Sequence, residues 1–175
     1  LLASEIVAQA AMKAGNRVKT NEVHGMAQRG GSVLAQIRYG KKVFSPLVAK
    51  GTARVLGALE RIEALRYSDY LTDDGLAVIN SQIVVPVTVS MGAANYPQDA
   101  KERLDKTFKK MIYIDAAQEA LALGNIKAAN VVLLGALSTG LDLPLEAWHE
   151  AVASCVPPKF KDLNLKAFDT GRQKA

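Results

Sequence analysis

Cysteine and histidine are scarce in this sequence, which has one cysteine and two histidines among 175 residues. A single thiol makes no internal disulfide and cannot hold an iron–sulfur cluster, which needs about four thiolates. Cys155 follows an apolar helical pattern, so we expect a core residue rather than a reactive thiol. With only His24 and His149 available, a zinc site built from histidine and cysteine is not expected. We therefore expect neither a metal site nor a catalytic residue in this chain.

Long hydrophobic runs are also absent. No stretch approaches the roughly 18 apolar residues that span a bilayer, and the first residues lack the basic lead of a secretory signal. A cytoplasmic protein without a membrane partner is the expectation. Aromatic residues make up 6% of the chain and do not alternate with basic ones in the way that stacks bases, so nucleic acid is not an expected partner.

Positive charge is in excess, with a net charge of +5. Much of it lies in Lys101–Lys110 and Lys159–Lys174, where basic residues alternate with acidic and apolar ones. This pattern is typical of solvated helix faces. An acidic partner subunit is the favoured explanation of the excess, and an excess without special meaning is the alternative.

The helical pattern begins at Leu1 without a capping residue before it, and Gly15-Asn16 supplies its C-terminal stop. A strand pattern follows at Arg17–Val23. A helix that leads into a strand in this way is usually the middle of a βαβ unit. The pattern predicts that a first strand and a turn precede Leu1, so that the domain is incomplete at its N-terminus.

The rest of the chain alternates between strand and helix patterns. Strands are expected at 32–39, 43–45, 53–59, 76–80, 84–89 and 111–115, and helices at 60–71, 97–109, 116–123, 126–137, 145–156 and 159–170. Gly40-Lys41-Lys42 predicts a hairpin that joins the first two of these strands, and Thr72–Gly75 predicts a turn. No linker or repeat divides the chain. Residues 1–175 are therefore expected to form a single domain, a three-layer α/β sandwich with a Rossmann-like mixed sheet.

The unusual segment is the loop that follows the strand at Arg17–Val23. Its candidate ligand or interface residues are Glu22, His24, Gly25, Met26, Gln28, Arg29, Gly30, Gly31 and Ser32. Open α/β sheets place ligands at strand ends, glycines allow close backbone approach, and their amides can surround an anion. Arg29 adds a guanidinium suited to carboxylate or phosphate. The alternative is a tight loop with a surface arginine and a structural histidine.

The run Thr20–Val33, together with Gln36–Gly40, closely resembles the gamma subunit or domain of 2-oxoacid:ferredoxin oxidoreductases, and within them the small subunit of indolepyruvate ferredoxin oxidoreductase. The resemblance continues through 58–60, 63–67, 127–131 and 134–136, so it spans most of the chain. Family members usually open with a strand and a glycine-rich turn before the helix that starts here at Leu1. That feature matches the upstream strand predicted above.

The resemblance implies a multi-subunit oxidoreductase that decarboxylates a 2-oxo acid to acyl-coenzyme A and CO2 and passes electrons to ferredoxin. It implies that thiamine diphosphate, Mg²⁺ and 4Fe–4S clusters lie on partner subunits, with coenzyme A as co-substrate. This chain would then be a non-catalytic gamma subunit that binds no cofactor alone, and whose Arg29 loop faces coenzyme A or a partner chain. Indolepyruvate is the favoured substrate by resemblance, with pyruvate and branched-chain 2-oxo acids as alternatives.

Two other functions compete with this interpretation. An independent Rossmann-like module could bind a nucleotide or small molecule at the N-terminus of the first helix. A stand-alone hydrolase or transferase would use Ser32 and His24 with Asp115 or another acid, although the sequence has no Gly-x-Ser-x-Gly elbow.

Overall fold

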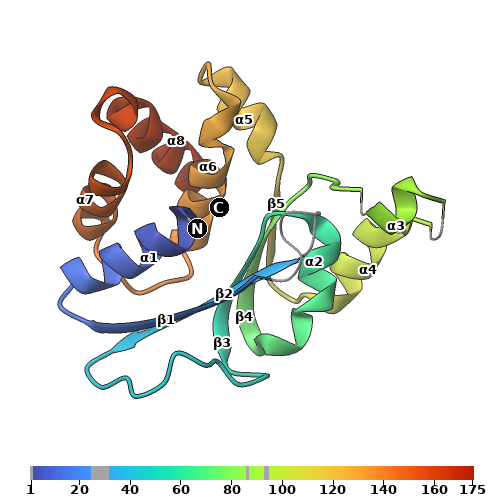
Figure 1. Cartoon of the computed structure of the whole chain (residues 1–175), viewed down its shortest axis with the longest axis horizontal. Coiled ribbons are helices and arrows are strands. Elements are labelled where there is room, and N and C mark those ends of the chain that lie inside the picture. The colour runs from blue at the N-terminus through green and yellow to red at the C-terminus, as the bar shows by residue number, and fades with distance from the viewer. Residues whose placement is uncertain (1, 25–31, 86, 93–94) are drawn as a thin grey trace.

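The computed structural model describes residues 2–24, 32–85, 87–92 and 95–175 (Figure 1). Strands β3 (Ala53–Ala58), β4 (Leu71–Asn80) and β5 (Met111–Ile114) form a parallel sheet in that order, and β1 (Arg17–His24) pairs antiparallel with β2 (Val33–Gly40). The helices are α1 (Leu2–Lys13), α2 (Arg61–Arg66), α3 (Val87–Ser90), α4 (Ala100–Thr107), α5 (Ala116–Ala122), α6 (Ala129–Ser138), α7 (Leu145–Cys155) and α8 (Lys161–Gln173), with 3-10 turns at Ser68–Tyr70, Ile126–Ala128 and Pro158–Phe160.

Helices cover both faces of the parallel sheet, so the predicted α/β class and its layered architecture are confirmed. Helices α1, α5, α6, α7 and α8 lie on one side and α2 and α4 on the other (Figure 1). The central strand β4 contributes side chains to the cores on both faces of the sheet, because successive side chains of a strand point to opposite faces. Val78 enters the larger core, whereas Ala77 and Ile79 enter the smaller core with Leu104 and Phe108.

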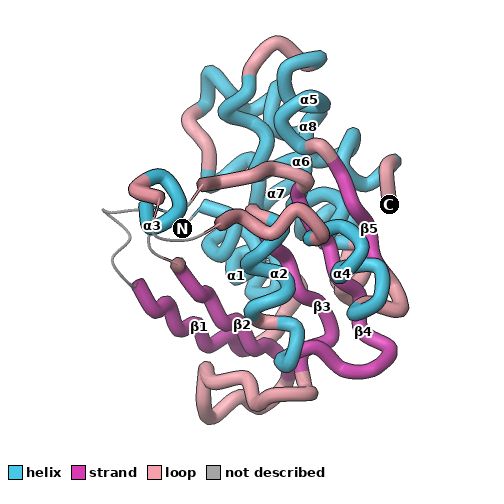
Figure 2. Tube along the Cα trace, turned by 90° about the vertical axis from the view of Figure 1, so that its right-hand side faces the viewer, coloured by secondary structure: helices cyan, strands magenta, loops and turns pink. Residues whose placement is uncertain are grey.

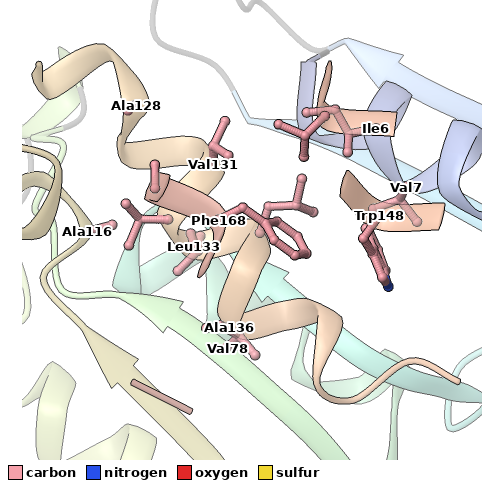
Figure 3. Close-up of a cluster of buried hydrophobic side chains, with 14 of the residues drawn as sticks. Ile6, Val7, Val78, Ala116, Ala128, Val131, Leu133, Ala136, Trp148 and Phe168 are labelled. Carbon is pink, nitrogen blue, oxygen red and sulfur yellow. The ribbon is translucent and has the colours of Figure 1, made fainter. Parts of the chain in front are cut away.

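The larger core lies between the parallel sheet and the helices of the first layer. Trp148 of α7 and Phe168 of α8 are fully buried with ring centroids 5.7 Å apart, and they meet Ile6 and Val7 of α1 (Figure 3). Ile37 of β2 packs against the same cluster. One apolar core therefore connects both sheets, which lie next to each other in Figure 2.

Several predicted helix boundaries are confirmed by their caps. The Asn125 side chain accepts a hydrogen bond from the Lys127 amide at the start of the 3-10 turn before α6. Pro144 occupies the N-cap position of α7. The segment expected to be apolar on all sides is α6, and seven of its ten residues are buried.

Two predicted elements are wrong. Residues 43–45 form no strand, and the loop that contains them is instead bonded through Leu47 and Val48 to side chains of β2. Thr72–Gly75 form no separate turn, because they lie inside β4. The pairing between β3 and β4 shifts there, from Ala53↔Leu71 to Val55↔Leu76, so turn-forming residues mark a bulge within a strand.

Other segments differ from the prediction at their boundaries. The helix expected over 60–71 ends at Arg66, and Leu71 already belongs to β4. Helix α4 begins at Ala100 rather than at Pro97. The segment expected to be extended over 84–89 instead enters the short helix α3 at Val87. The side chain of Tyr96 is bonded to Glu60 and Arg61, which holds the residues before α4 against the start of α2.

Candidate functional site

The loop singled out from the sequence joins two paired strands. Gly25, Met26, Gln28, Arg29, Gly30 and Gly31 lie outside the described residues, whereas Glu22, His24 and Ser32 are described. The last register pair of β1 and β2 is His24↔Val33, so the two ends of the loop are adjacent. The structure therefore fixes where the loop starts and ends.

The first end of the loop is bonded to helix α1. The Ser4 hydroxyl donates to the Glu22 carboxylate with an Oγ–Oε1 distance of 2.5 Å, and His24 Nε2 lies 3.3 Å from Glu22 Oε2. The Ser4 hydrogen bond holds the pKa of Glu22 below its ordinary value of 4.5, and His24 lowers that pKa further, although partial burial opposes both effects. Glu22 is thus a structural carboxylate that links β1 to the first turn of α1.

An open depression of about 310 Å³ lies beside this link, lined by Ser4, Glu5, Ala8, Thr20 and Glu22. Two of these five residues are carboxylic acids and none is basic. An anionic ligand would be repelled there. The described lining therefore opposes a phosphate site in this depression between α1 and β1.

The second end of the loop is bonded to helix α2. The Ser32 hydroxyl donates to the Glu63 carboxylate and lies 3.1 Å from the Tyr67 hydroxyl. Glu63 also pairs with Arg66 at 3.1 Å. These contacts connect the loop to residues that follow β3, at the carboxyl edge of the parallel sheet. The loop is thereby attached to the first helix layer at one end and to the second at the other.

A polar cluster that sequence reasoning missed lies at this carboxyl edge. The Glu60 side chain is buried and accepts from the Ile62 and Glu63 amides at the start of α2. Its other oxygen accepts from the Tyr96 hydroxyl at 2.5 Å, and Arg61 Nε donates to Tyr96 at 3.0 Å. The hydrogen bond to Tyr96 raises the pKa of Arg61, while burial, followed by the Glu60 bond, raises the pKa of Tyr96.

Side chains at the carboxyl ends of the neighbouring strands β4 and β5 also bond to backbone groups of the chain. The buried Asn80 at the end of β4 accepts from the Ala116 amide and donates to the Leu59 carbonyl. Asp115, directly after β5, accepts from the Gln118 amide at 2.9 Å. The amides that begin α2 and α5 thus already bond carboxylates of the chain itself. The N-cap position favours Asp, Asn, Ser, Thr and Gly, so the glutamate at position 60 gave no sequence signal of a cap.

The hydrolase alternative has no geometric support. Ser32 is bonded to Glu63 and Tyr67, His24 to Glu22, and Asp115 to the start of α5. Each candidate side chain thus has a structural partner other than the two residues it would need. Cys155 packs against the larger core, and burial raises the pKa of its thiol, as expected of an unreactive cysteine.

Within 2–24, 32–85, 87–92 and 95–175, no group of three or more His, Cys, Asp or Glu side chains is arranged to hold a metal ion. Across the same ranges no helix is long and apolar enough to cross a membrane.

Known proteins similar to this chain belong to one group. A family model described as pyruvate ferredoxin/flavodoxin oxidoreductase matches residues 1–174. Indolepyruvate oxidoreductase subunit IorB of Pyrococcus horikoshii is 44% identical over 98% of this chain and 87% of that protein, and the same subunit of Archaeoglobus fulgidus is 40% identical over 100% and 89%. The crystal structure of a keto/oxoacid ferredoxin oxidoreductase gamma subunit from Geobacter sulfurreducens PCA has a TM-score of 0.71, with 27% identity over 99% of this chain and 89% of that chain.

Proposed function

This chain belongs to the pyruvate ferredoxin/flavodoxin oxidoreductase family, and we propose that it is the non-catalytic gamma-type subunit, or domain, of a thiamine diphosphate-dependent 2-oxoacid:ferredoxin oxidoreductase. The observation that carries the proposal is the match over residues 1–174, together with 44% identity to a named subunit of an oxidoreductase. Residues 1–175 act in this proposal as one gamma domain.

The chemistry is assigned to partner subunits. They hold thiamine diphosphate, Mg²⁺ and 4Fe–4S clusters, which supply decarboxylation and electron transfer to ferredoxin, and coenzyme A accepts the acyl group. This chain contributes shape and charge. In support, the described candidate side chains are bonded to neighbouring residues of the fold: Glu22 to Ser4 and His24, and Ser32 to Glu63.

The loop is the proposed point of contact with the rest of the enzyme. Its ends are fixed to two different helices, through Ser4–Glu22 at one end and Ser32–Glu63 at the other. In this proposal Arg29 and the glycine amides of the loop face an anionic group, either coenzyme A or an acidic side chain of a partner. Anchored ends make such a contact less costly, because the residues on either side of the loop are already held by the fold before it binds.

The substrate is proposed to be indolepyruvate or another aryl pyruvate. Two relatives that are 40% and 44% identical are named for indolepyruvate. Pyruvate and branched-chain 2-oxo acids are the alternatives. Steady-state kinetics of the complex with these three classes of 2-oxo acid, compared by kcat/KM, distinguishes them.

Assembly and activity test the proposal together. Mass analysis of a native pull-down of the full chain should find subunits with cluster-type cysteines and bound thiamine diphosphate. The complex should reduce a ferredoxin or viologen in the presence of a 2-oxo acid and coenzyme A, and the isolated chain should not. Turnover of a substrate by the purified chain alone would refute the non-catalytic role.

Arg29→Ala tests the part that the loop plays. We expect lower kcat/KM for the 2-oxo acid or for coenzyme A in the assembled complex, while the circular dichroism of the subunit stays unchanged. Arg103→Ala is the matched control, because Arg103 is an exposed arginine on α4. Equal kinetics for wild type and both variants would assign Arg29 to an ordinary surface position.

A further inference from the structure

The connection between β2 and β3 presents two large apolar side chains to solvent. Phe44 is 89% exposed and Leu47 is 60% exposed, and both belong to the segment 41–50, here called the Phe44 loop. A single exposed apolar residue is ordinary on a protein surface. A phenylalanine this exposed in a loop with a second exposed apolar residue is a candidate anchor, because buried aromatic residues dominate many interfaces.

The Phe44 loop is held in place by hydrogen bonds to its neighbours. The Arg38 guanidinium donates to the Leu47 carbonyl at 3.1 Å, and the Gln36 side-chain oxygen accepts from the Val48 amide at 3.3 Å. Beyond it, the Gly51 amide donates to the Asp69 carbonyl at 2.7 Å. The loop is thus tied to β2 and to the turn before β4, yet Phe44 points away from both cores. A preorganised apolar side chain loses little conformational entropy on binding.

The charged residues of the sequence segment that contains the Phe44 loop are all basic. No aspartate or glutamate occurs between Glu22 and Glu60. The basic residues of that interval are Arg29, Arg38, Lys41, Lys42, Lys50 and Arg54. Lys19 is paired in register with Arg38, so both side chains lie on the same face of the β1–β2 pair. Of the loop's own lysines, Lys50 is paired with an acid, Asp69, at 3.2 Å.

We propose that the Phe44 loop docks on an acidic surface of the large partner subunit, with Phe44 inserted into an apolar recess and Lys41 and Lys42 facing carboxylates at its rim. The inference rests on the proposed function, which supplies that subunit. A second copy of this chain is a poor occupant, because a two-fold contact through this loop would place lysines against lysines. The Phe44 side chain, buried on docking, would supply affinity, and Lys41 and Lys42 would speed and orient association.

Binding of the full chain to its thiamine diphosphate subunit tests the proposal. We expect Phe44→Ser to raise the dissociation constant by about 30-fold or more, which is the scale of the loss when a buried aromatic anchor is removed. Leu121→Ser is the matched control, because Leu121 is an apolar residue of α5 that is 58% exposed. The control should bind as the wild type does, and both variants should keep the wild-type circular dichroism.

Charge reversal tests the contribution of Lys41 and Lys42. Lys41→Glu with Lys42→Glu should weaken binding and reduce its dependence on salt, because screening acts on the charge pairs that the reversal removes. Lys109→Glu with Lys110→Glu is the control, since it changes an equally exposed adjacent lysine pair outside the loop. Wild-type affinity in Phe44→Ser would overturn the docking proposal while leaving the proposed function intact. Failure of the wild type to bind any partner subunit would overturn both.

Discussion

Single side chains fix the ends of the candidate loop, and Ser32 is the one that crosses from the loop to α2. Its hydroxyl contacts both Glu63 and Tyr67 in a part-buried setting. Ser32→Ala removes this link, and we expect the free energy of unfolding in urea to fall by about 1 kcal/mol. Ser154→Ala is the control, because Ser154 donates to a carbonyl of its own helix, α7. An equal loss in both variants would mean that the Glu63 contact has no special weight.

The contribution of Glu22 to the stability of the fold should depend on pH. Its pKa is lowered in the folded chain, mainly by Ser4. Its stabilising contribution is therefore present above the ordinary pKa of 4.5 and is lost as pH falls through the lower folded value. In Ser4→Ala the Glu22 carboxyl should titrate closer to 4.5 in a carbon-detected NMR titration. The stability difference between wild type and Ser4→Ala should then shrink as pH falls below 4.5, and a constant difference would contradict this cause.

The sequence located the loop but not the residues that hold it. Gly25, Arg29 and their neighbours form a local pattern, which a sequence displays directly. Ser4, Glu63 and Tyr67 reach the loop through contacts between residues 18 to 35 positions apart. Such contacts depend on how β1, α1 and α2 pack, and no local pattern encodes that packing. The buried Glu60–Tyr96 pair, 36 positions apart, was missed for the same reason.

At the scale of elements, helices were easier to predict than strand pairing. The ends of α6 and α7 carry local signals in Asn125 and Pro144, and the structure uses both. The strand assigned to 43–45 had a plausible turn before it, but in the structure the loop that follows β2 bonds to side chains of β2 rather than to its backbone. The residues Thr72–Gly75 have turn chemistry, and tertiary pairing with β3 places them inside a bulged strand. Strand assignments fail where a distant partner decides the outcome.

The crossing of α6 and α8 depends on two glycines. A Cβ at Gly171 would lie 1.8 Å from the Val132 carbonyl oxygen, and one at Gly135 would lie 2.0 Å from the Phe168 carbonyl oxygen. In a helix Gly→Ala is normally favourable, yet here the methyl group meets backbone that cannot move aside cheaply. We expect Gly171→Ala to lower the free energy of unfolding by about 2 kcal/mol or more.

Chemical unfolding in guanidinium chloride measures this effect. Lys166→Ala, an exposed change on the same helix, is the control and should leave the unfolding midpoint nearly unchanged. A more stable Gly171→Ala variant would show that the two helices separate without cost. That outcome would remove the close crossing as an explanation for the two glycines.

The described part of the chain forms two sheets and two apolar clusters, and β4 contributes side chains to both clusters. Val78 of β4 belongs to the larger cluster and Ile79 to the smaller one, while Ile37 of β2 attaches the antiparallel pair to the larger cluster. A strand shared by two cores couples their stability, because unfolding of that strand removes side chains from both cores at once. We therefore propose that the chain unfolds as one cooperative unit, in keeping with the single domain expected from the sequence.

Trp148 makes this proposal measurable, because it is the single tryptophan and is fully buried in the larger cluster. Leu104→Ala removes a fully buried side chain from the smaller cluster, across the sheet, at an expected cost of about 2–5 kcal/mol. If the two clusters unfold together, the fluorescence of Trp148 and the far-ultraviolet circular dichroism shift to lower denaturant by the same amount. A Trp148 transition that stays in place while the circular dichroism shifts would mean that the clusters unfold separately, with β4 coupling them only weakly.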